Sequence, residues 1–238
     1  MRVLLLGDSY TYGPYGDSLK ALFEAAGHDV TRVGIAGVSA STYLNGKWRT
    51  LPAKGDYNAA KTKSYDLAIV SLGTNDAALF VKSAAGAQRV ASDMKTLTDG
   101  ITAKRIVWVG APAFNDLAAK HYNSKQGRVP NLNARASLVW DAVAPIYGAN
   151  SIDPRDATRP WTKNLGIEIH FGAKGGAAWA RYVFDKVMTG AETVETPSES
   201  EGPLAPPTPS SIHPLLLAAI AFIAFKALTG GKRGRLAY

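Results

Sequence analysis

Two segments far apart in the chain carry the residue types that nucleophilic catalysis needs. Ser9, in the run Gly-Asp-Ser-Tyr at residues 7–10, supplies a hydroxyl, and His170, in the segment 167–171, supplies an imidazole. A serine hydroxyl is a poor nucleophile until a base removes its proton. Histidine suits that task because its ordinary pKa lies near neutral pH. Ser9 and His170 are therefore a candidate nucleophile and its candidate base.

Two further loops contain groups that can stabilise negative charge. Attack on an ester carbonyl places that charge on oxygen, and fixed hydrogen-bond donors must hold it. The backbone N–H of Ser9, the backbone N–H of Gly37 and the side-chain NH₂ of Asn75 are candidate donors. Gly37 suits the role because it has no Cβ and lets a substrate approach the main chain.

Short apolar runs alternate with helical patterns through residues 1–190, which predicts parallel strands joined by helices. The carboxyl ends of such strands form the binding edge of an open sheet. We expect Ser9, Gly37, Asn75 and His170 at that edge, with His170 following the fifth strand. The prediction is a three-layer α/β/α sandwich with a five-stranded parallel sheet. Its strands are expected at Val3–Gly7, Val30–Ala36, Asp66–Leu72, Arg105–Ala111 and Asn150–Asp153, and its helices from about Asp17 and at Ala87–Ile101, Leu132–Tyr147 and Ala173–Met188.

Taken in chain order, these motifs resemble the sequence blocks of the SGNH (GDSL-type) hydrolases. They are Gly7-Asp8-Ser9, Ala36-Gly37-Val38-Ser39, Gly73-Thr74-Asn75-Asp76 and a histidine near the end of the domain. The resemblance covers residues 1–190 and implies a flavodoxin-like fold. It also implies ester hydrolysis through an acyl-enzyme, with no metal and no other cofactor. It assigns Ser9 as nucleophile, Gly37 and Asn75 as oxyanion donors, and His170 as base.

One position departs from the family pattern, which usually has an aspartate three residues before the histidine. That position is Ile167 here, and strand-like alternation turns Glu168 to a different side. Three alternatives follow. A backbone carbonyl holds the ring of a Ser-His dyad, Glu168 swings in to hold it, or the enzyme is weakened or inactive.

Aromatic residues crowd the loop that follows the candidate nucleophile. Tyr10 and Tyr12 are candidate substrate-binding residues, because their rings can form a wall for a sugar ring or an acyl chain. The structural alternative is a loop that is simply anchored by its tyrosine rings.

The composition changes near residue 190 and predicts three parts. Residues 1–190 form the hydrolase domain, and residues 191–211, rich in Pro, Glu and Ser, read as an extended linker. Residues 212–238 contain the apolar run Leu215–Phe225 followed by basic residues. We interpret residues 212–228 as a single C-terminal membrane anchor, shorter than the usual span of about 20 residues. The alternatives are a helix that docks on a partner protein or one that lies on a membrane surface.

The formal net charge of +8 belongs to residues 1–190, because the tail after residue 190 has four acidic and four basic residues. The basic residues within 1–190 are scattered along the sequence, which is typical of a solvated surface. The alternative interpretation is that they attract an anionic cell-surface polymer. No block of like charge supports a nucleic-acid partner. The absence of cysteine excludes a thiolate nucleophile and a Cys-ligated metal.

The tail creates a problem of orientation. Basic residues after the apolar run place the C-terminus in the cytosol by the positive-inside rule. The hydrolase domain would then cross the bilayer, although the N-terminus does not read as a signal peptide. A cytosol-facing tail anchor avoids this conflict, and so does a place in the membrane of a virus particle.

The sequence therefore predicts a membrane-anchored serine esterase or deacetylase. Its substrate would be an acyl ester, such as an O-acetyl ester on a cell-envelope glycan. The alternative is a catalytically weak or inactive module of the same fold that binds a glycan or serves as a structural protein of a virion.

Overall fold

The computed structural model describes residues 1–190 except 122, 125–126, 129, 164 and 166–167. The predicted linker at 191–211 and the predicted anchor within 212–238 lie outside these residues. Among the helices that are described, none is both long enough and apolar enough to span a bilayer.

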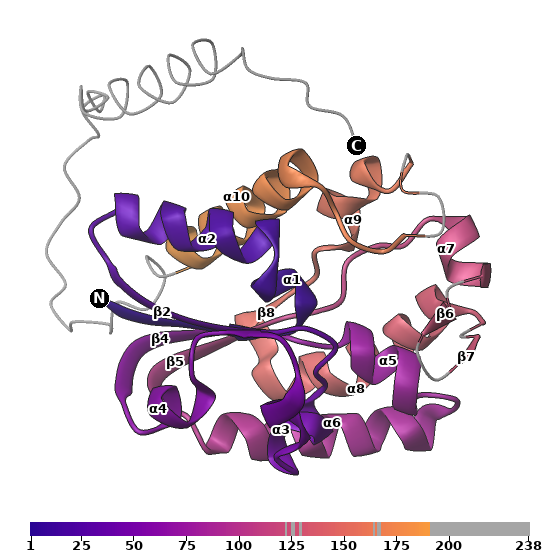
Figure 1. Cartoon of the computed structure of the whole chain (residues 1–238), viewed down its shortest axis with the longest axis horizontal. Helices are drawn as coiled ribbons and strands as arrows, with labels where there is room; N and C mark the ends of the chain where they lie inside the picture. Colours follow the sequence, from indigo (N-terminus) through magenta and orange to yellow (C-terminus); the bar gives the residue numbers. More distant parts are fainter. Residues whose placement is uncertain (122, 125–126, 129, 164, 166–167, 191–238) are drawn as a thin grey trace, which may run out of the picture. The chain divides into compact units, whose positions relative to one another are not determined.

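A six-stranded sheet forms the centre of the molecule (Figure 1). Its spatial order is β3-β2-β1-β4-β5-β8, and every pairing is parallel except that of β3 with β2. The strands are β1 (Arg2–Gly7), β2 (Asp29–Ile35), β3 (Ala53–Lys54), β4 (Ser64–Ser71), β5 (Thr102–Val109) and β8 (Ser151–Ile152).

Helices cover both faces of the sheet, as predicted (Figure 1). One face packs against α2 (Pro14–Ala25) and α10 (Ala173–Thr189), and the other against α3 (Ala40–Leu44), α5 (Thr74–Phe80), α6 (Ala84–Asp99) and α8 (Leu132–Tyr147). The remaining helices are α1 (Ser9–Tyr12), α4 (Tyr57–Lys61), α7 (Asp116–His121) and α9 (Arg155–Thr158), and β6 (Asn123–Ser124) pairs with β7 (Gly127–Arg128). Three short 3₁₀ turns span Lys47–Thr50, Gly148–Asn150 and Arg159–Trp161.

Strand β1 shows why its sequence lacks polar alternation. Val3 and Leu5 pack into the core under α2 and α10, whereas Leu4 and Leu6 pack into the core on the opposite face. All four side chains are at most 1% exposed. A strand that is buried on both faces is therefore apolar throughout.

The prediction of a five-stranded parallel sheet is wrong because the sheet contains one further strand, which makes it six-stranded and mixed. The extra strand, β3, has only two residues and pairs antiparallel with Gly34 and Ile35 of β2. Such a short strand has no periodicity that sequence reading can detect, and it follows Pro52, which cannot donate a ladder hydrogen bond.

The expectation that His170 follows the fifth strand is also wrong. Strand β8 ends at Ile152, and the chain passes through α9 and a 3₁₀ turn before it reaches His170. Residues 168–172 have no regular secondary structure. The apolar alternation at Ile169 and Phe171 arises because both side chains are buried, at 3% and 5% exposure, and not because the segment pairs in a sheet.

Close backbone contacts fix α1 against the sheet. A Cβ placed on Gly34 of β2 would lie 2.4 Å from the backbone nitrogen of Tyr12, and one placed on Gly16 would lie 1.8 Å from the carbonyl oxygen of Thr11. Only glycine fits at both positions. The sheet and α2 therefore hold the short helix that begins at Ser9 in one place.

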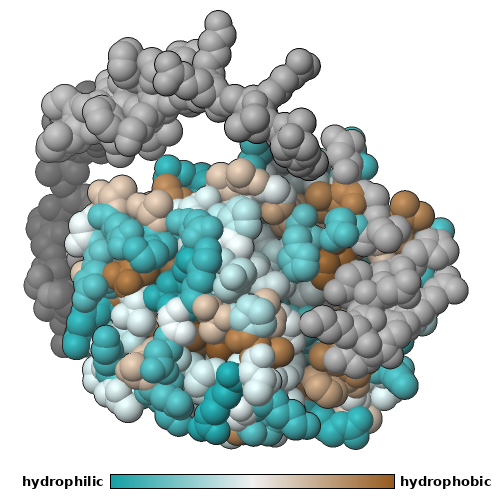
Figure 2. Space-filling model, in the orientation of Figure 1, coloured by the Kyte–Doolittle hydropathy of each residue, from teal (hydrophilic) through white to brown (hydrophobic). Residues whose placement is uncertain are grey.

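Figure 2 shows how hydrophobic residues are distributed on one face of the described residues. On the face shown in Figure 2, hydrophobic residues form separate small areas between hydrophilic ones. Isolated apolar side chains of this kind are normal on soluble domains.

Candidate active site

Ser9 lies where β1 ends and α1 begins. Asp8 caps the helix, with its carboxylate accepting a hydrogen bond from the backbone N–H of Tyr10 at 3.0 Å. The hydroxyl oxygen of Ser9 lies 2.9 Å from Nε2 of His170. The fold therefore brings together the two residues that the sequence identified as nucleophile and base.

The segment before α10 aims His170 toward Ser9. Ile169 and Phe171 are buried on either side of it in the two separate cores, which leaves the intervening imidazole at the surface. The helix then begins directly after Gly172. Packing of the two flanking apolar residues thus determines where the histidine points.

Of the two other predicted site residues, Asn75 lies in the first turn of α5, and Gly37 lies in the turn that follows β2. Nδ2 of Asn75 donates to the carbonyl oxygen of Val38 at 2.9 Å, and it lies 3.4 Å from Oδ2 of Asp8. Asn75 therefore anchors the loop that contains Gly37. Gly37 itself is exposed, has a φ of +75°, and would have open space around an added Cβ.

The arrangement of these loops agrees with the sequence comparisons. The model of the GDSL-like lipase/acylhydrolase family matches residues 5–178. The chain belongs to this family. The sequence matches no curated protein.

Solved structures of GDSL/SGNH hydrolases share the fold. The carbohydrate acetylesterase Est24 of Sinorhizobium meliloti and the aryl esterase of M. smegmatis each align with a TM-score of 0.54, at 19% and 18% identity. Each comparison covers 79% of this chain and 98% of the other. An extracellular lipase of Streptomyces rimosus has a TM-score of 0.51 at 18% identity, with 78% and 98% covered. At these identities the likeness concerns the fold alone.

The position three residues before the histidine, where the family usually has its acid, is Ile167, which lies outside the described residues. Glu168 is exposed, and the structure records no hydrogen bond between its side chain and His170. Among the described residues, none accepts a hydrogen bond from Nδ1 of His170. Burial by its neighbours lowers the pKa of His170, and the charge of Glu168 opposes that change.

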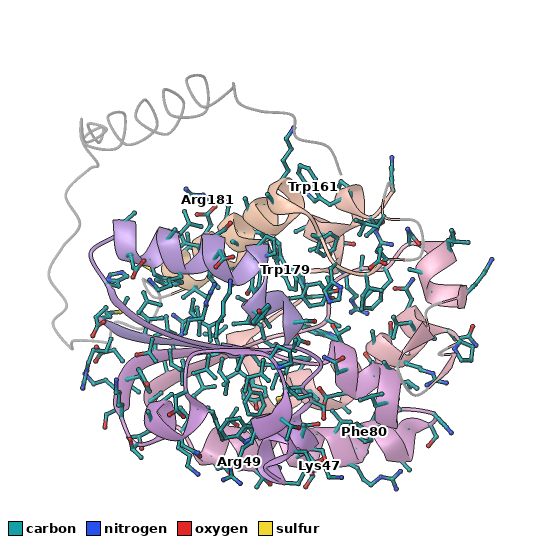
Figure 3. All side chains as sticks on the ribbon, in the orientation of Figure 1. Lys47, Arg49, Phe80, Trp161, Trp179 and Arg181 are labelled. Carbon is teal, nitrogen blue, oxygen red and sulfur yellow. The ribbon has the colours of Figure 1, made fainter. Side chains whose placement is uncertain are left out.

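Tyr10 contacts the histidine segment directly. Its hydroxyl donates to the carbonyl oxygen of Ile169 at 2.6 Å, and its ring centre lies 5.3 Å from that of His170. The ring also packs edge-on against Trp179 of α10, which points from that helix toward α1 (Figure 3). A hydrogen bond thus joins the residue after Ser9 to the residue before His170.

A pocket of about 310 Å³ opens beside Ser9 and His170. Both tyrosines that were predicted to bind substrate line it, but they differ in character: Tyr10 is 4% exposed, whereas Tyr12 is half-buried. Tyr15, the third tyrosine of the same segment, also lines the pocket, and the sequence pattern did not identify the other walls. The remaining lining residues are Gly13, Pro14, Ala36, Phe171 and Gly176.

Two buried carboxyl groups lie behind the site, and the sequence pattern gave neither of them a catalytic role. Asp8 and Asp76 are each 1% exposed. Oδ1 of Asp76 accepts from the backbone N–H of Ala40 at 3.0 Å, and its Oδ2 has no partner among the described residues. Burial raises the pKa of each aspartate to about 7, and the charge of Asp76 contributes to the rise for Asp8. Their place within the serine and asparagine motifs was the one available signal.

These raised pKa values predict that stability falls as pH increases. The folded state binds the protons of Asp8 and Asp76 more tightly than the unfolded chain, so stability is lost between about pH 4 and pH 7. The Asp76→Asn variant cannot lose this proton. We expect its free energy of unfolding, measured with urea, to differ less between pH 5 and pH 8 than that of the wild type.

Asp66→Asn provides the matched control for this measurement. Hydrogen bonds from Lys104 and the backbone of Arg2 lower the pKa of Asp66 to about 2, so it is ionised in both states above pH 5. Its replacement should leave the difference between pH 5 and pH 8 unchanged. An Asp76→Asn variant with the wild-type pH dependence would contradict the assignment.

Proposed function

We propose that this chain is a serine ester hydrolase that uses Ser9 and His170 as a catalytic dyad. The observation that carries the proposal is the 2.9 Å distance between the Ser9 hydroxyl and His170 Nε2. The pair lies at the mouth of a pocket, and the chain belongs to an acylhydrolase family. Nucleophile, base and binding space are thus present together.

In the first half of the reaction, Oγ of Ser9 attacks the carbonyl carbon of the ester while Nε2 of His170 takes the hydroxyl proton. The backbone N–H groups of Ser9 and Gly37 and the side chain of Asn75 are the proposed donors to the oxyanion. One N–H of Asn75 is committed to Val38. The same nitrogen also makes a long hydrogen bond of 3.4 Å to Oδ2 of Asp8, and this is the contact that an oxyanion would replace.

The oxyanion intermediate then collapses. The bond between the carbonyl carbon and the alcohol oxygen breaks, and that oxygen takes the proton from His170, so that the alcohol leaves. In the second half, His170 removes a proton from water, and the water oxygen attacks the acyl-enzyme. His170 then returns the proton to Oγ of Ser9, which releases the carboxylic acid and restores the starting state.

Tyr10 is the proposed positioning residue for His170. In a triad, an acid holds the imidazole in place, and its loss costs about 10⁴ in kcat where nothing replaces it. Here the Tyr10 hydroxyl holds the main chain at Ile169, and its ring packs near the imidazole. These contacts fix the ring's position but do not supply a negative charge to the imidazolium.

Substitution of the dyad tests the proposed function. We expect Ser9→Ala to reduce the hydrolysis of 4-nitrophenyl acetate by at least about 10³-fold. Since His170 must be neutral to accept the proton, kcat/KM should rise with pH and reach half its plateau below pH 6.5, in keeping with the lowered pKa. The measurement is a pH profile of the wild type.

A fluorophosphonate probe provides a readout that does not depend on the choice of ester. It should label the wild type at Ser9 and leave Ser9→Ala unlabelled. Equal turnover by both proteins would end the proposal. If neither turnover nor labelling occurs, the chain is instead a non-catalytic module of the same fold.

Removal of the Tyr10 hydroxyl tests the positioning role. We expect Tyr10→Phe to lower kcat by about tenfold and to leave KM nearly unchanged, because a lost orienting hydrogen bond is worth about 1.4 kcal/mol. The control is Tyr65→Phe. It removes another buried hydrogen bond from a tyrosine to a carbonyl, that of Tyr65 to Ala60, at a distant end of the fold. An equal loss of kcat in both variants would contradict the role.

The membrane anchor remains a proposal that rests on the sequence of residues 212–228. Its support is the apolar run Leu215–Phe225 followed by basic residues. The full chain should partition into the membrane fraction, whereas residues 1–190 should stay in the supernatant. Equal partition of both would remove the anchor, and with it the argument for a virion membrane.

A further inference from the structure

The walls of the pocket beside the dyad are almost entirely apolar. Tyr12 and Pro14 contribute from α1 and the start of α2, and Phe171 contributes from the segment before α10. No Lys, Arg, Asp or Glu is among the residues that line it. An ester group that enters this space meets rings and aliphatic carbon.

The polar atoms of the inner wall are already engaged. The hydroxyl of Tyr10 donates to Ile169, and the hydroxyl of Tyr15 lies 3.0 Å from Oγ of Ser71. A ligand hydroxyl that is buried here would lose its water and gain few partners, which is costly. A sugar is therefore a poor occupant, and this argues against the expected glycan ester.

The position of the pocket identifies which part of the ester it holds. The alcohol oxygen must receive its proton from Nε2 of His170, so the leaving alcohol lies on the histidine side of the reacting carbon. His170 and its neighbour Phe171 line the pocket. Of the three proposed oxyanion donors, only Ser9 lines it, and Gly37 and Asn75 do not. An oxyanion that is held by Gly37 and Asn75 therefore faces away from this space, and the alcohol on the histidine side faces toward it.

We propose that the pocket binds the alcohol portion of the substrate, and that this portion is an apolar group of about the size of one ring. The inference rests on the proposed function. A volume of about 310 Å³ is at the small end of ligand pockets. Tyr12 forms its outer wall. The ring of Tyr12 is held in place from outside the pocket by the ammonium group of Lys54, which lies 5.1 Å from the ring centre.

The test compares acetate esters whose alcohols have similar acidity but different polarity. Benzyl acetate and 2-hydroxyethyl acetate suit this purpose, since the reacting bond is the same. We expect kcat/KM to be about 10- to 100-fold higher for benzyl acetate, the range that apolar pockets give for small differences in bound groups. Equal values for the two esters would overturn the inference.

Variants of Tyr12 connect that preference to the pocket. Tyr12→Ala removes the outer wall and should reduce the preference for benzyl acetate to less than threefold. Tyr12→Phe keeps the ring and should retain the preference. If Tyr12→Ala instead changes the response to acyl length, measured with benzyl acetate and benzyl hexanoate, the pocket holds the acyl group and the assignment to the alcohol is wrong.

Binding of the free alcohol gives a readout without turnover. In the Ser9→Ala variant, saturation-transfer NMR should detect benzyl alcohol and should not detect ethylene glycol, and Tyr12→Ala in the same background should abolish the signal. If the wild type hydrolyses esters without this selectivity, the proposed function stands and the inference about the pocket is wrong. If the wild type hydrolyses no ester and is not labelled by the fluorophosphonate probe, the proposed function is wrong. The inference, which rests on it, is then wrong as well.

Discussion

The contact between Ser9 and His170 depends on a hydrogen bond between two segments, α1 and the segment before α10, which the sheet does not join directly. The histidine lies on an irregular segment with no strand to fix it. A hydrogen bond from Tyr10 to Ile169 and the burial of Phe171 hold that segment beside α1. Burial matters here because water cannot compete for the donor and acceptor of a hydrogen bond that is shielded from it. The close approach of the two side chains thus depends on a third residue, Tyr10, which contacts the histidine segment.

The side chain of Asn75, a proposed oxyanion donor, also makes structural contacts. Asn75 holds the loop of Gly37 through Val38 and still faces the carboxyl group of Asp8. Asp8 in turn caps the helix of the nucleophile. Because burial raises the pKa of Asp8 to about 7, the carboxyl group beside Asn75 loses its proton near neutral pH.

Much of the fold could be predicted from sequence because its strands are apolar runs of ordinary length, and the predicted helix Leu132–Tyr147 matches α8 in full. Ser9 and Asn75 could be named as candidates because short motifs follow the ends of β1 and β4. Strand β3 was missed because two residues carry no pattern. His170 was wrongly predicted to follow a strand for a related reason. An alternation of apolar and polar residues arises wherever alternate side chains are buried, whether or not the segment pairs with a strand. The tie through Tyr10 is a tertiary contact, which no local pattern encodes.

The two-residue strands at the borders of the sheet have a consequence for association between copies of the chain. Long unpaired strands at a border attract strands of other molecules and lead to aggregation. Here β3 and β8 end the sheet after two residues each, and β3 runs against its neighbour and carries Lys54. Because β3 pairs only with Gly34 and Ile35, and β8 only with Trp108 and Val109, neither of them covers the earlier part of its neighbour. An incoming strand would therefore find backbone to pair with along the first residues of β2 and β5, and not along β3 or β8.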